Sequence, residues 1–270
     1  MKQKIKIVDQ MFAHAEYSTD YQKSKYIDWD RSKIITTDEN IFYTDYSLNQ
    51  VGNNKTTFGW LLESPEITKH SYDWIKRNND KFTHVLTHNK ELLDKGENFI
   101  FCPTGGCWIT PEDQKIYEKN KLLSIIASSK RITHGHLLRH KSISMYSNKL
   151  DVYGRGYNPV DYKLEALKDY AFSLTIENTK QDYYFTEKLI DCFMTGTVPI
   201  YWGCPSIGNF FNVDGMIIFD DISELKEILE GLSLDKYIKM KEAIEDNFKK
   251  AKEYLIAEDY IYKNYLNRDV

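Results

Sequence analysis

The amino-acid sequence predicts an α/β protein that contains two parallel β-sheets. Short apolar runs alternate with helix-like segments up to about residue 115, which is the pattern of a small α/β domain. A charged stretch at residues 111–121 precedes a new series of apolar runs. Within that series, residues 170–202 read strand, loop, helix, strand, which predicts a βαβ unit with parallel strands and a right-handed crossover. A chain of 270 residues has room for one large or two small domains.

The first domain is predicted at residues 1–117. Its strands are expected at residues 4–12, 32–37, 41–44, 57–62, 82–87 and 99–102. Helices are expected at residues 71–78 and 89–95, with Asn89 as the N-cap of the second. Residues 14–26 are polar and rich in tyrosine, and the sequence assigns them no element.

The second domain is predicted at residues 118–245. Strands are expected at residues 122–127, 151–154, 170–176, 198–202 and 216–219. Helices are expected at residues 135–147, 161–168, 187–194, 222–229 and 234–262. The last of these is long and amphipathic, with charged residues on one face.

The loop inside the βαβ unit is the first candidate site. Ligands of open parallel sheets bind beyond the carboxyl ends of strands, and here that end carries Glu177 and Asn178. Thr186 is a candidate N-cap and Gly196 a candidate C′ residue for the helix between them. Lys188 lies in the first helical turn, where a lysine is unfavourable unless an anion is bound. The position is consistent with a phosphate site, or with a lysine that pairs with Glu187 or points to water.

The segment ENTKQDYYFTEKLIDCFMTGTVPIYWG, at residues 177–203, closely resembles the donor-binding motif of the glycosyltransferase family 10 α-1,3/4-fucosyltransferases. The family pattern is E-N-(S/T), a short spacer, Y-x-T-E-K, an apolar helix and G-x-(I/V)-P-(I/V)-x-x-G. The strong match covers about residues 120–220. It implies a GT-B fold, in which two Rossmann-like domains face each other across a cleft. It also implies an inverting enzyme that uses GDP-fucose and needs no metal, and places Asn178, Tyr184, Glu187 and Lys188 at the sugar nucleotide. A terminal segment at residues 246–270 would then return to the first domain, which would bind the acceptor.

A basic cluster at residues 128–141 follows a predicted strand and opens a helix. It contains Lys130, His136 and Arg139, and a pyrophosphate needs charge-assisted donors of this kind. A solvated basic face is the alternative. By resemblance, Arg139 aligns with the family arginine that holds the donor diphosphate. A zinc site is disfavoured, because His134 and His136 face different sides of a helix.

Two further segments are candidates for ligand contacts. Residues 151–158, DVYGRGYN, place two glycines after a strand, so that Tyr153 or Tyr157 stacks on a base or the segment forms an ordinary turn. Residues 103–108, PTGGCW, either bind the acceptor through Trp108 or form a turn.

An inverting transfer needs a base to take the proton of the acceptor hydroxyl. The proposed base of the family is a glutamate that ends a strand of the first domain shortly before a proline, and Glu63 is its counterpart here. Glu66 and Asp45 are the alternative candidates for the base. Glu63 could instead have a structural role, as a carboxylate that caps a helix. We expect Glu187 to bind donor sugar hydroxyls, and Glu177 either to contact the donor or to support the site by hydrogen bonds.

Composition excludes some classes of function. The net charge of −4 and the lack of a long basic run make nucleic acid a poor partner. The start MKQKIKIVDQMF lacks the apolar stretch of a signal peptide, and the four cysteines fit reduced thiols, so a cytoplasmic location is expected, with peripheral membrane association left open. The 20 tyrosines and 5 tryptophans suit sugar faces and interfaces.

The resulting hypothesis is an α-1,3-fucosyltransferase of glycan biosynthesis, with a sugar nucleotide and a glycan as its partners. The alternatives are a GT-B enzyme that uses another GDP- or UDP-sugar, and a catalytically silent protein that binds nucleotide sugars or glycans. A Rossmann enzyme that modifies nucleotide sugars is disfavoured, because residues 8–15 contain no glycine after the first strand. The acceptor, the linkage position and the oligomeric state are left open.

Overall fold

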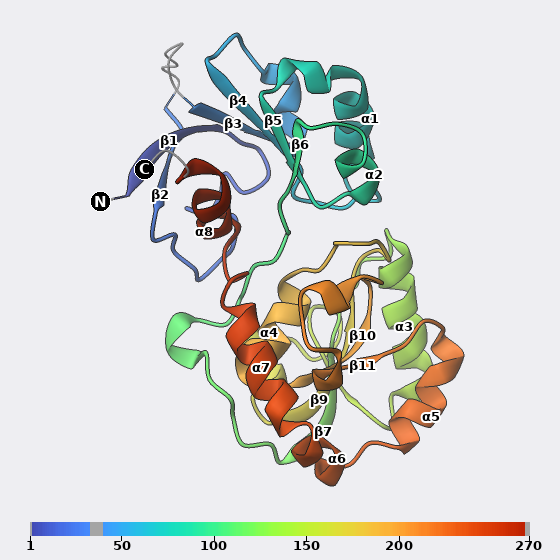
Figure 1. Cartoon of the computed structure of the whole chain (residues 1–270). Helices are drawn as coiled ribbons and strands as arrows, with labels where there is room; N and C mark the ends of the chain where they lie inside the picture. The colour runs from blue at the N-terminus through green and yellow to red at the C-terminus, as the bar shows by residue number, and fades with distance from the viewer. Residues whose placement is uncertain (1, 33–39, 268–270) are drawn as a thin grey trace.

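The computed structural model describes residues 2–32 and 40–267. It contains two α/β domains, each built on a parallel sheet (Figure 1). The strand order is β2-β1-β3-β4-β5-β6 in the first sheet and β11-β10-β9-β7-β8 in the second. This architecture confirms the predicted α/β fold with two Rossmann-like domains.

The first domain follows the sequence prediction closely, apart from its second strand. Its strands are β1 Gln3–Val8, β2 Ile27–Asp30, β3 Asn40–Thr44, β4 Thr56–Trp60, β5 His84–Thr87 and β6 Phe99–Phe101. Its helices are α1 Lys69–Asn78 and α2 Lys90–Leu93, and Asn89 caps α2 as predicted. The sequence analysis missed β2. The strand predicted at residues 32–37 lies outside the described residues except for its first position.

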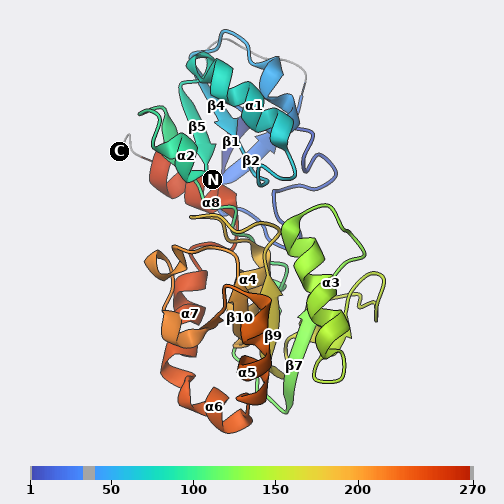
Figure 2. The same ribbon diagram turned by 90° about the vertical axis from the view of Figure 1, so that its right-hand side faces the viewer.

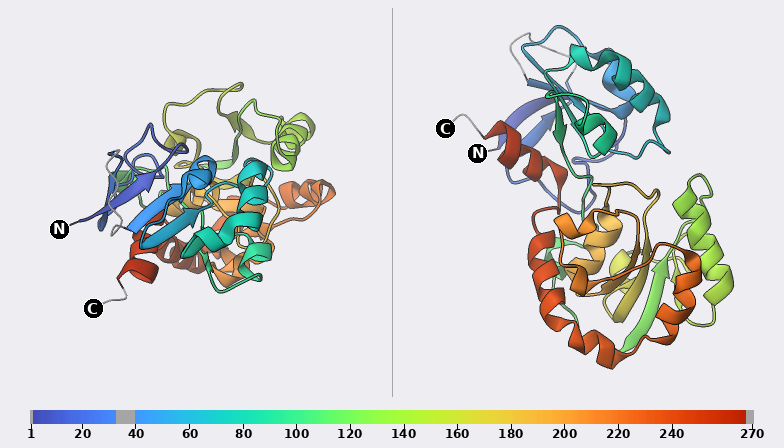
Figure 3. Two further views of the ribbon diagram at one scale, coloured as in Figure 1. Left: turned by 90° about the horizontal axis from the view of Figure 1, so that it is seen from above. Right: turned by 45° about the vertical axis from the view of Figure 1, so that its right-hand side comes forward.

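In the second domain the sheet is sandwiched between helices (Figures 2 and 3). Its strands are β7 Lys121–Ile126, β8 Asp151–Tyr153, β9 Tyr170–Ile176, β10 Val198–Trp202 and β11 Ile217–Ile218. Its helices are α3 His134–Tyr146, α4 Glu187–Thr195, α5 Leu225–Glu230, α6 Leu234–Lys239 and α7 Lys241–Ala251. The helix predicted at residues 161–168 is a short 3-10 turn, Lys163–Ala166.

The predicted βαβ unit is confirmed as β9, α4 and β10. The two strands pair in parallel, with Val198 opposite Phe172 and Trp202 opposite Ile176. Thr186 caps α4 through the backbone N–H of Lys188, and Gly196 ends the helix in the left-handed conformation at φ 69°. Both end signals are local in sequence, which explains why the pattern predicted them correctly.

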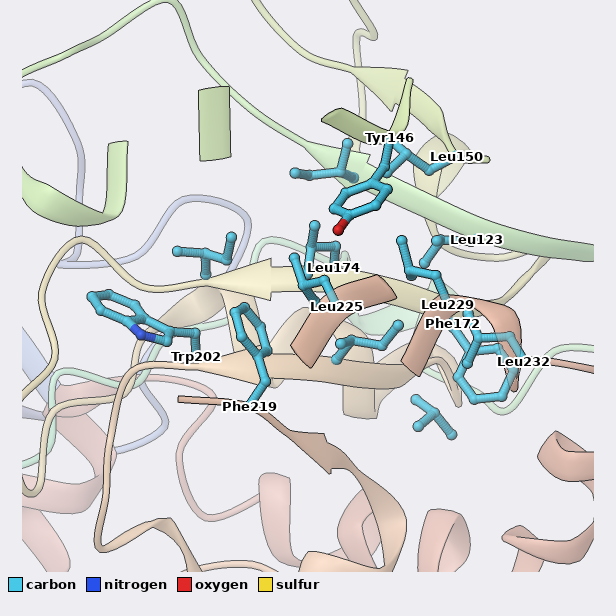
Figure 4. Packing of buried hydrophobic residues seen from close by; sticks show 14 of the residues in the cluster. Leu123, Tyr146, Leu150, Phe172, Leu174, Trp202, Phe219, Leu225, Leu229 and Leu232 are labelled. Carbon is cyan, nitrogen blue, oxygen red and sulfur yellow. The ribbon is translucent and has the colours of Figure 1, made fainter. Parts of the chain in front are cut away.

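The core of the second domain fixes the position of β9. All seven residues of this strand are buried, because β10 and β7 flank it and helices cover the sheet. Phe172 and Leu174 pack with Trp202, Phe219 and Leu225 in one apolar cluster (Figure 4). Each such buried side chain contributes about 1.5–3 kcal/mol of hydrophobic stabilisation. The carboxyl end of β9, where the candidate site begins, therefore rests on a rigid base.

The single helix predicted at residues 234–262 is wrong. The chain breaks it into α6, α7 and α8 Ala257–Ile261, followed by a π-helical turn, Tyr262–Leu266. Helix α7 packs against α4 of the second domain, whereas Ala257 and Ile261 of α8 are buried in the core of the first domain. One straight helix could not pack in the cores of both domains. The chain therefore ends α7 and crosses to the first domain, where α8 begins (Figure 1). The buried carboxylate of Glu258 accepts hydrogen bonds from Ser18 and from the Trp29 indole.

The two chain segments that join the domains touch each other at Gly105 and Gly106. Gly106 N–H donates to the Tyr254 carbonyl at 2.8 Å, and Gly105 N–H donates to the Phe185 carbonyl at 3.1 Å. Gly105 has φ +52°, and a Cβ there would lie 2.8 Å from the Tyr254 carbonyl oxygen. The PTGGCW segment is therefore a tight turn that holds together the two chain segments joining the domains.

The described residues also bear on the state of the cysteines and on membrane-spanning helices. Cys102, Cys107, Cys192 and Cys204 are all buried free thiols. Among residues 2–32 and 40–267, none of the helices has the length and apolar content needed to span a membrane.

Candidate active site

A cavity of about 660 Å³ lies between the two domains, at the carboxyl ends of the strands. Both domains contribute walls to it. The first domain supplies Met11, Phe12, Ser18, Thr19, Trp60, Leu62, Glu63 and Thr104. The second domain supplies, among others, Lys130, His136, Arg139, Lys163, Asn178, Tyr184, Glu187, Lys188 and Asp191. All five predicted donor-binding residues therefore line one cavity, together with the predicted base.

Arg139 joins α3 to the end of β9. Its Nε donates to the Ile176 carbonyl at 3.0 Å, and its Nη2 donates to Asn178 Oδ1 at 2.7 Å. The guanidinium is mostly buried, and burial lowers the pKa of Arg139, whereas Glu177 and Glu187 raise it. A guanidinium has five N–H donors, so these two bonds leave donors for a ligand in the cavity.

His136, a candidate donor contact, caps the first turn of α3. Its Nδ1 accepts from the Thr133 backbone N–H at 3.2 Å, while Thr133 Oγ1 accepts from the His136 backbone N–H at 3.3 Å. Burial and the neighbouring cations Arg139, Lys188 and Lys130 lower the pKa of His136 to about 4. The ring is therefore neutral at physiological pH, and it supports the helix start while also lining the cavity.

Lys188 lines the same cavity as Arg139 and is also paired. Its Nζ lies 3.2 Å from Glu187 Oε1, 3.1 Å from Thr186 Oγ1 and 3.8 Å from Glu177 Oε2. The pairing with Glu187 that was weighed from the sequence is therefore present, and the anion site stays a prediction. An anion would meet Lys188 beside the N-terminus of α4.

Glu177 does not line the cavity, but it supports residues that do. Its carboxylate is fully buried and accepts from Thr186 N–H at 2.9 Å and from Thr186 Oγ1 at 2.6 Å. The candidate role of Glu177 as a direct donor contact is therefore corrected to one of positioning the start of α4. Burial raises the pKa of Glu177, and Lys188 counteracts that effect.

Tyr153 is a second correction. Its hydroxyl is hydrogen-bonded to the Tyr170 hydroxyl at 2.7 Å and its ring packs on the same residue, outside the cavity lining. Tyr157, the other aromatic of that turn, bonds to His140. Gly154 and Arg155 line the cavity instead. The strand was predicted to within one residue, but the contact of Tyr153 with Tyr170, 17 residues later, depends on how the strands assemble.

Tyr184 presents an unsatisfied donor. Its side chain is fully buried and lines the cavity, yet its hydroxyl has no hydrogen-bond partner within the part of the chain that the structure describes. Burial and the nearby carboxylates Glu63 and Glu177 raise the pKa of Tyr184 well above its usual value, so the phenol keeps its proton. Buried polar groups in native proteins are paired, and a bound ligand would supply the partner.

A charge network beside the cavity was missed by sequence reasoning. Lys163 Nζ lies 2.8 Å from Asp191 Oδ2 and 3.4 Å from Glu187 Oε1, and Asp191 Oδ1 accepts from Trp108 N–H at 2.6 Å. Burial disfavours the charged form of Glu187, but Lys188 and Lys163 outweigh burial and hold the pKa of Glu187 below its usual range. Asp191 stands four residues after Glu187 on the same face of an apolar helix, and that spacing was the available signal.

Glu63 lies on the first-domain wall, on a loop with several anchors. The Tyr72 hydroxyl donates to the Glu63 carbonyl at 2.8 Å, and buried Asp45 accepts from Leu62 N–H at 2.9 Å and from Thr68 Oγ1 at 3.0 Å. Burial raises the pKa of the Glu63 carboxyl, Lys188 lowers it, and Glu187 raises it further. Asp45, weighed as an alternative base, lies outside the cavity lining and holds this loop.

Two α/β domains that face each other across such a charged cavity define a GT-B glycosyltransferase fold. A crystal structure of an α1,3-fucosyltransferase with GDP shares it with a TM-score of 0.62 and 19% identity, covering 100% of this chain and 92% of that one. The crystal structure of TarM is similar with a TM-score of 0.56 and 13% identity, over 84% of this chain and 54% of that one.

The sequence identifies the family within this fold class. The family model for glycosyltransferase family 10 (fucosyltransferase), C-terminal part, matches residues 116–259, and the chain belongs to that family. An α-(1,3)-fucosyltransferase, FucT, of Helicobacter pylori is 40% identical over 83 residues, which cover 31% of this chain and 16% of that protein. The 4-galactosyl-N-acetylglucosaminide 3-α-L-fucosyltransferase 9 of Mus musculus is 25% identical over 224 residues, which cover 76% of this chain and 61% of that protein. These matches span less than two thirds of either relative, and the family predicted from the sequence motif is confirmed.

Gly135 offers a test of how tightly the site is assembled. Its N–H donates to the Asn178 carbonyl at 2.9 Å, and a Cβ there would lie 1.8 Å from the Glu177 carbonyl oxygen. We expect Gly135→Ala to lower the free energy of unfolding by about 1–3 kcal/mol or more, because backbone must move to admit the methyl group. Urea denaturation would measure this change.

Gly208→Ala is the matched control, since a Cβ there would meet only Val213 Cγ1, at 3.4 Å. Equal unfolding midpoints for Gly135→Ala and Gly208→Ala would contradict the packing of α3 on the loop after β9.

Proposed function

We propose that this protein is an inverting glycosyltransferase that moves fucose from GDP-fucose to a hydroxyl group of a glycan, forming an α-1,3 linkage. The observation that carries the proposal is the presence of Arg139 and Lys188 in one cavity, at the carboxyl end of β9. Family membership and the known activity in the names of its relatives support fucosyl transfer. A solved α1,3-fucosyltransferase with a matching fold is described with GDP-fucose.

In the proposed reaction the donor diphosphate binds Arg139, Lys188 and the N-terminus of α4. Asn178 and Tyr184 orient the donor, and Glu187, held ionised by two lysines, accepts hydrogen bonds from sugar hydroxyls. The acceptor hydroxyl attacks the anomeric carbon while the bond from that carbon to the phosphate oxygen breaks. Glu63 takes the hydroxyl proton, and GDP leaves with its charge stabilised by the two cations. These cations would supply the charge that a metal ion supplies in other transferases, so we propose that none is required.

Lys188→Ala tests the donor site. Loss of one charge-assisted hydrogen bond should weaken GDP binding at least about tenfold, which corresponds to about 1.4 kcal/mol. Lys180→Ala is the control, because Lys180 stands in the same loop but pairs with Asp220 outside the cavity lining. Isothermal titration with GDP would measure both variants, and equal affinities would remove Lys188 from the donor site.

The wild-type protein should transfer fucose from GDP-fucose to a galactosyl-N-acetylglucosamine acceptor, and not from GDP-mannose or UDP-sugars. Transfer from another sugar nucleotide would show a different donor. Binding of GDP without turnover of any donor would favour the catalytically silent alternative.

The pH profile tests Glu63 as the base. Its carboxyl must be ionised to accept a proton, and its pKa is raised above its ordinary value of 4.5, mainly by burial. We therefore expect kcat/KM for transfer to fall as the pH drops through this raised pKa, with an acidic limb above pH 4.5. Glu63→Gln should lower transfer about 10²–10⁴-fold, remove that limb and leave GDP affinity unchanged. Full transfer by Glu63→Gln would assign the base elsewhere.

A further inference from the structure

Glu66, weighed from sequence as an alternative base, bridges the two domains. It belongs to the first domain, but both of its carboxylate oxygens bond to the second. Thr179 Oγ1 donates to Oε1 at 2.5 Å, and the His134 backbone N–H donates to Oε2 at 3.1 Å. His134 is the first residue of α3, so the carboxylate also meets the positive end of a helix of 13 residues.

In the second domain, Glu66 bonds to the loop that carries predicted donor-binding residues. Thr179 is buried and directly follows Asn178. Asn178 accepts from Arg139 through its side chain and from Gly135 N–H through its carbonyl. Glu66 therefore bonds to the same short segment that orients Arg139.

In the first domain, Glu66 belongs to the loop that carries Glu63. Ile67 and Thr68 donate backbone N–H groups to the Ser64 carbonyl at 2.9 and 3.1 Å, which closes the loop into a compact turn. Asp45 and Tyr72 hold its two ends, as described above. Glu66 and Glu63, three residues earlier, therefore belong to the same hydrogen-bonded turn.

We propose that Glu66 is a positioning residue that holds the base Glu63 in register with the donor loop, so that donor binding and proton removal are coupled. This inference rests on the proposed function. The Glu66 carboxylate touches Thr179 and the start of α3, and Glu66 acts on the reaction through Glu63.

Glu66→Ala should lower kcat for transfer about 10–100-fold, because a small misplacement of a reacting group has an effect of that order. GDP affinity should fall by a smaller factor than kcat, because Arg139 keeps its own bonds to Ile176 and Asn178. The urea midpoint should change little, since Glu66 is exposed. Glu66→Gln keeps one acceptor oxygen and should recover part of the rate. Glu97→Ala is the control, an exposed glutamate of the same domain.

Thr179→Val should reproduce part of the loss, and the double variant should be no worse than Glu66→Ala, because Glu66→Ala already breaks the bond that Thr179→Val removes. A kcat for Glu66→Ala equal to that of Glu97→Ala, or additive losses in the double variant, would overturn the proposal. A wild-type protein with no transfer activity would instead remove the proposed function on which it rests.

A second, independent observation concerns aromatic side chains beside the cavity. Tyr21 of the first domain and Tyr162 of the second are 49% and 55% exposed, with ring centroids 6.1 Å apart. Tyr21 has φ 64°, a left-handed backbone that is rare for a bulky residue. Buried groups keep its loop in place, because Gln22 Nε2 donates to the Ile109 carbonyl at 2.8 Å and Ser24 Oγ donates to Asp259 at 2.7 Å.

Both tyrosines are close in sequence to residues that line the cavity. Ser18 and Thr19, just before Tyr21, line the cavity, as does Lys163, just after Tyr162. Lys163 Nζ lies 4.4 Å from the centre of the Trp108 ring, and Trp108 lines the cavity while remaining 40% exposed. Exposed aromatic faces with polar tips suit the apolar faces of sugar rings.

We infer that Tyr21, Tyr162 and Trp108 form an outer carbohydrate subsite, which binds a sugar unit of the acceptor beyond the one that is fucosylated. This inference also rests on the proposed function. The probes are the disaccharide galactosyl-N-acetylglucosamine and a tetrasaccharide of two such units.

The wild-type protein should have a lower KM for the tetrasaccharide than for the disaccharide. Tyr21→Gly, which also relieves the left-handed backbone, and Tyr162→Ala should each raise the tetrasaccharide KM about fivefold and leave the disaccharide KM unchanged. Tyr46→Ala is the control, an exposed tyrosine whose sequence neighbours, unlike those of Tyr21 and Tyr162, do not line the cavity. Equal KM values for the two acceptors, or an unaltered ratio in the variants, would overturn the subsite, whereas absent transfer would remove the proposed function.

Discussion

The structure of the site depends on the bond between the Arg139 guanidinium and the end of β9. A mostly buried cation is costly unless it is paired and hydrogen-bonded. Here the Ile176 carbonyl and Asn178 supply the hydrogen bonds, while Glu177 and Glu187 supply opposite charge. Those same contacts fix where α3 starts relative to the loop after β9. The fold therefore cannot form this junction without also placing a cation in the cavity.

Several charged side chains that line the cavity are paired with one another. Lys188 pairs with Glu187, and Lys163 pairs with Asp191 and Glu187. Such pre-pairing avoids unpaired buried charge and fixes side-chain geometry in the free protein. An incoming diphosphate then meets donors that are already oriented, so that little side-chain entropy is lost on binding. Tyr184 is the exception, since its buried hydroxyl has no partner among the described residues.

Features that depend on a few adjacent residues could be predicted from the sequence, and features that depend on distant contacts could not. Thr186 and Gly196 mark the ends of α4 by their own chemistry, so the βαβ unit and its loop were predictable. The break between α7 and α8 exists because Ala257 and Ile261 pack in a core whose other buried residues lie more than 150 residues earlier in the sequence. Lys163 joins the site through Asp191, 28 residues later, and nothing in its own neighbourhood indicates that contact.

The division of labour between the domains explains why directional hydrogen bonds cross their junction. The predicted base Glu63 comes from the first domain, whereas Arg139 and Lys188, which would receive the leaving group, come from the second. Inversion requires attack on the face of the anomeric carbon opposite the leaving group, so the reaction needs one defined distance between the domains. Apolar packing alone would allow the domains to slide. The glycine turn at Gly105 and Gly106 fixes one contact between them, and the directional bonds of Glu66 fix another, so the relative position of base and cations is set by hydrogen bonds whose geometry allows little variation.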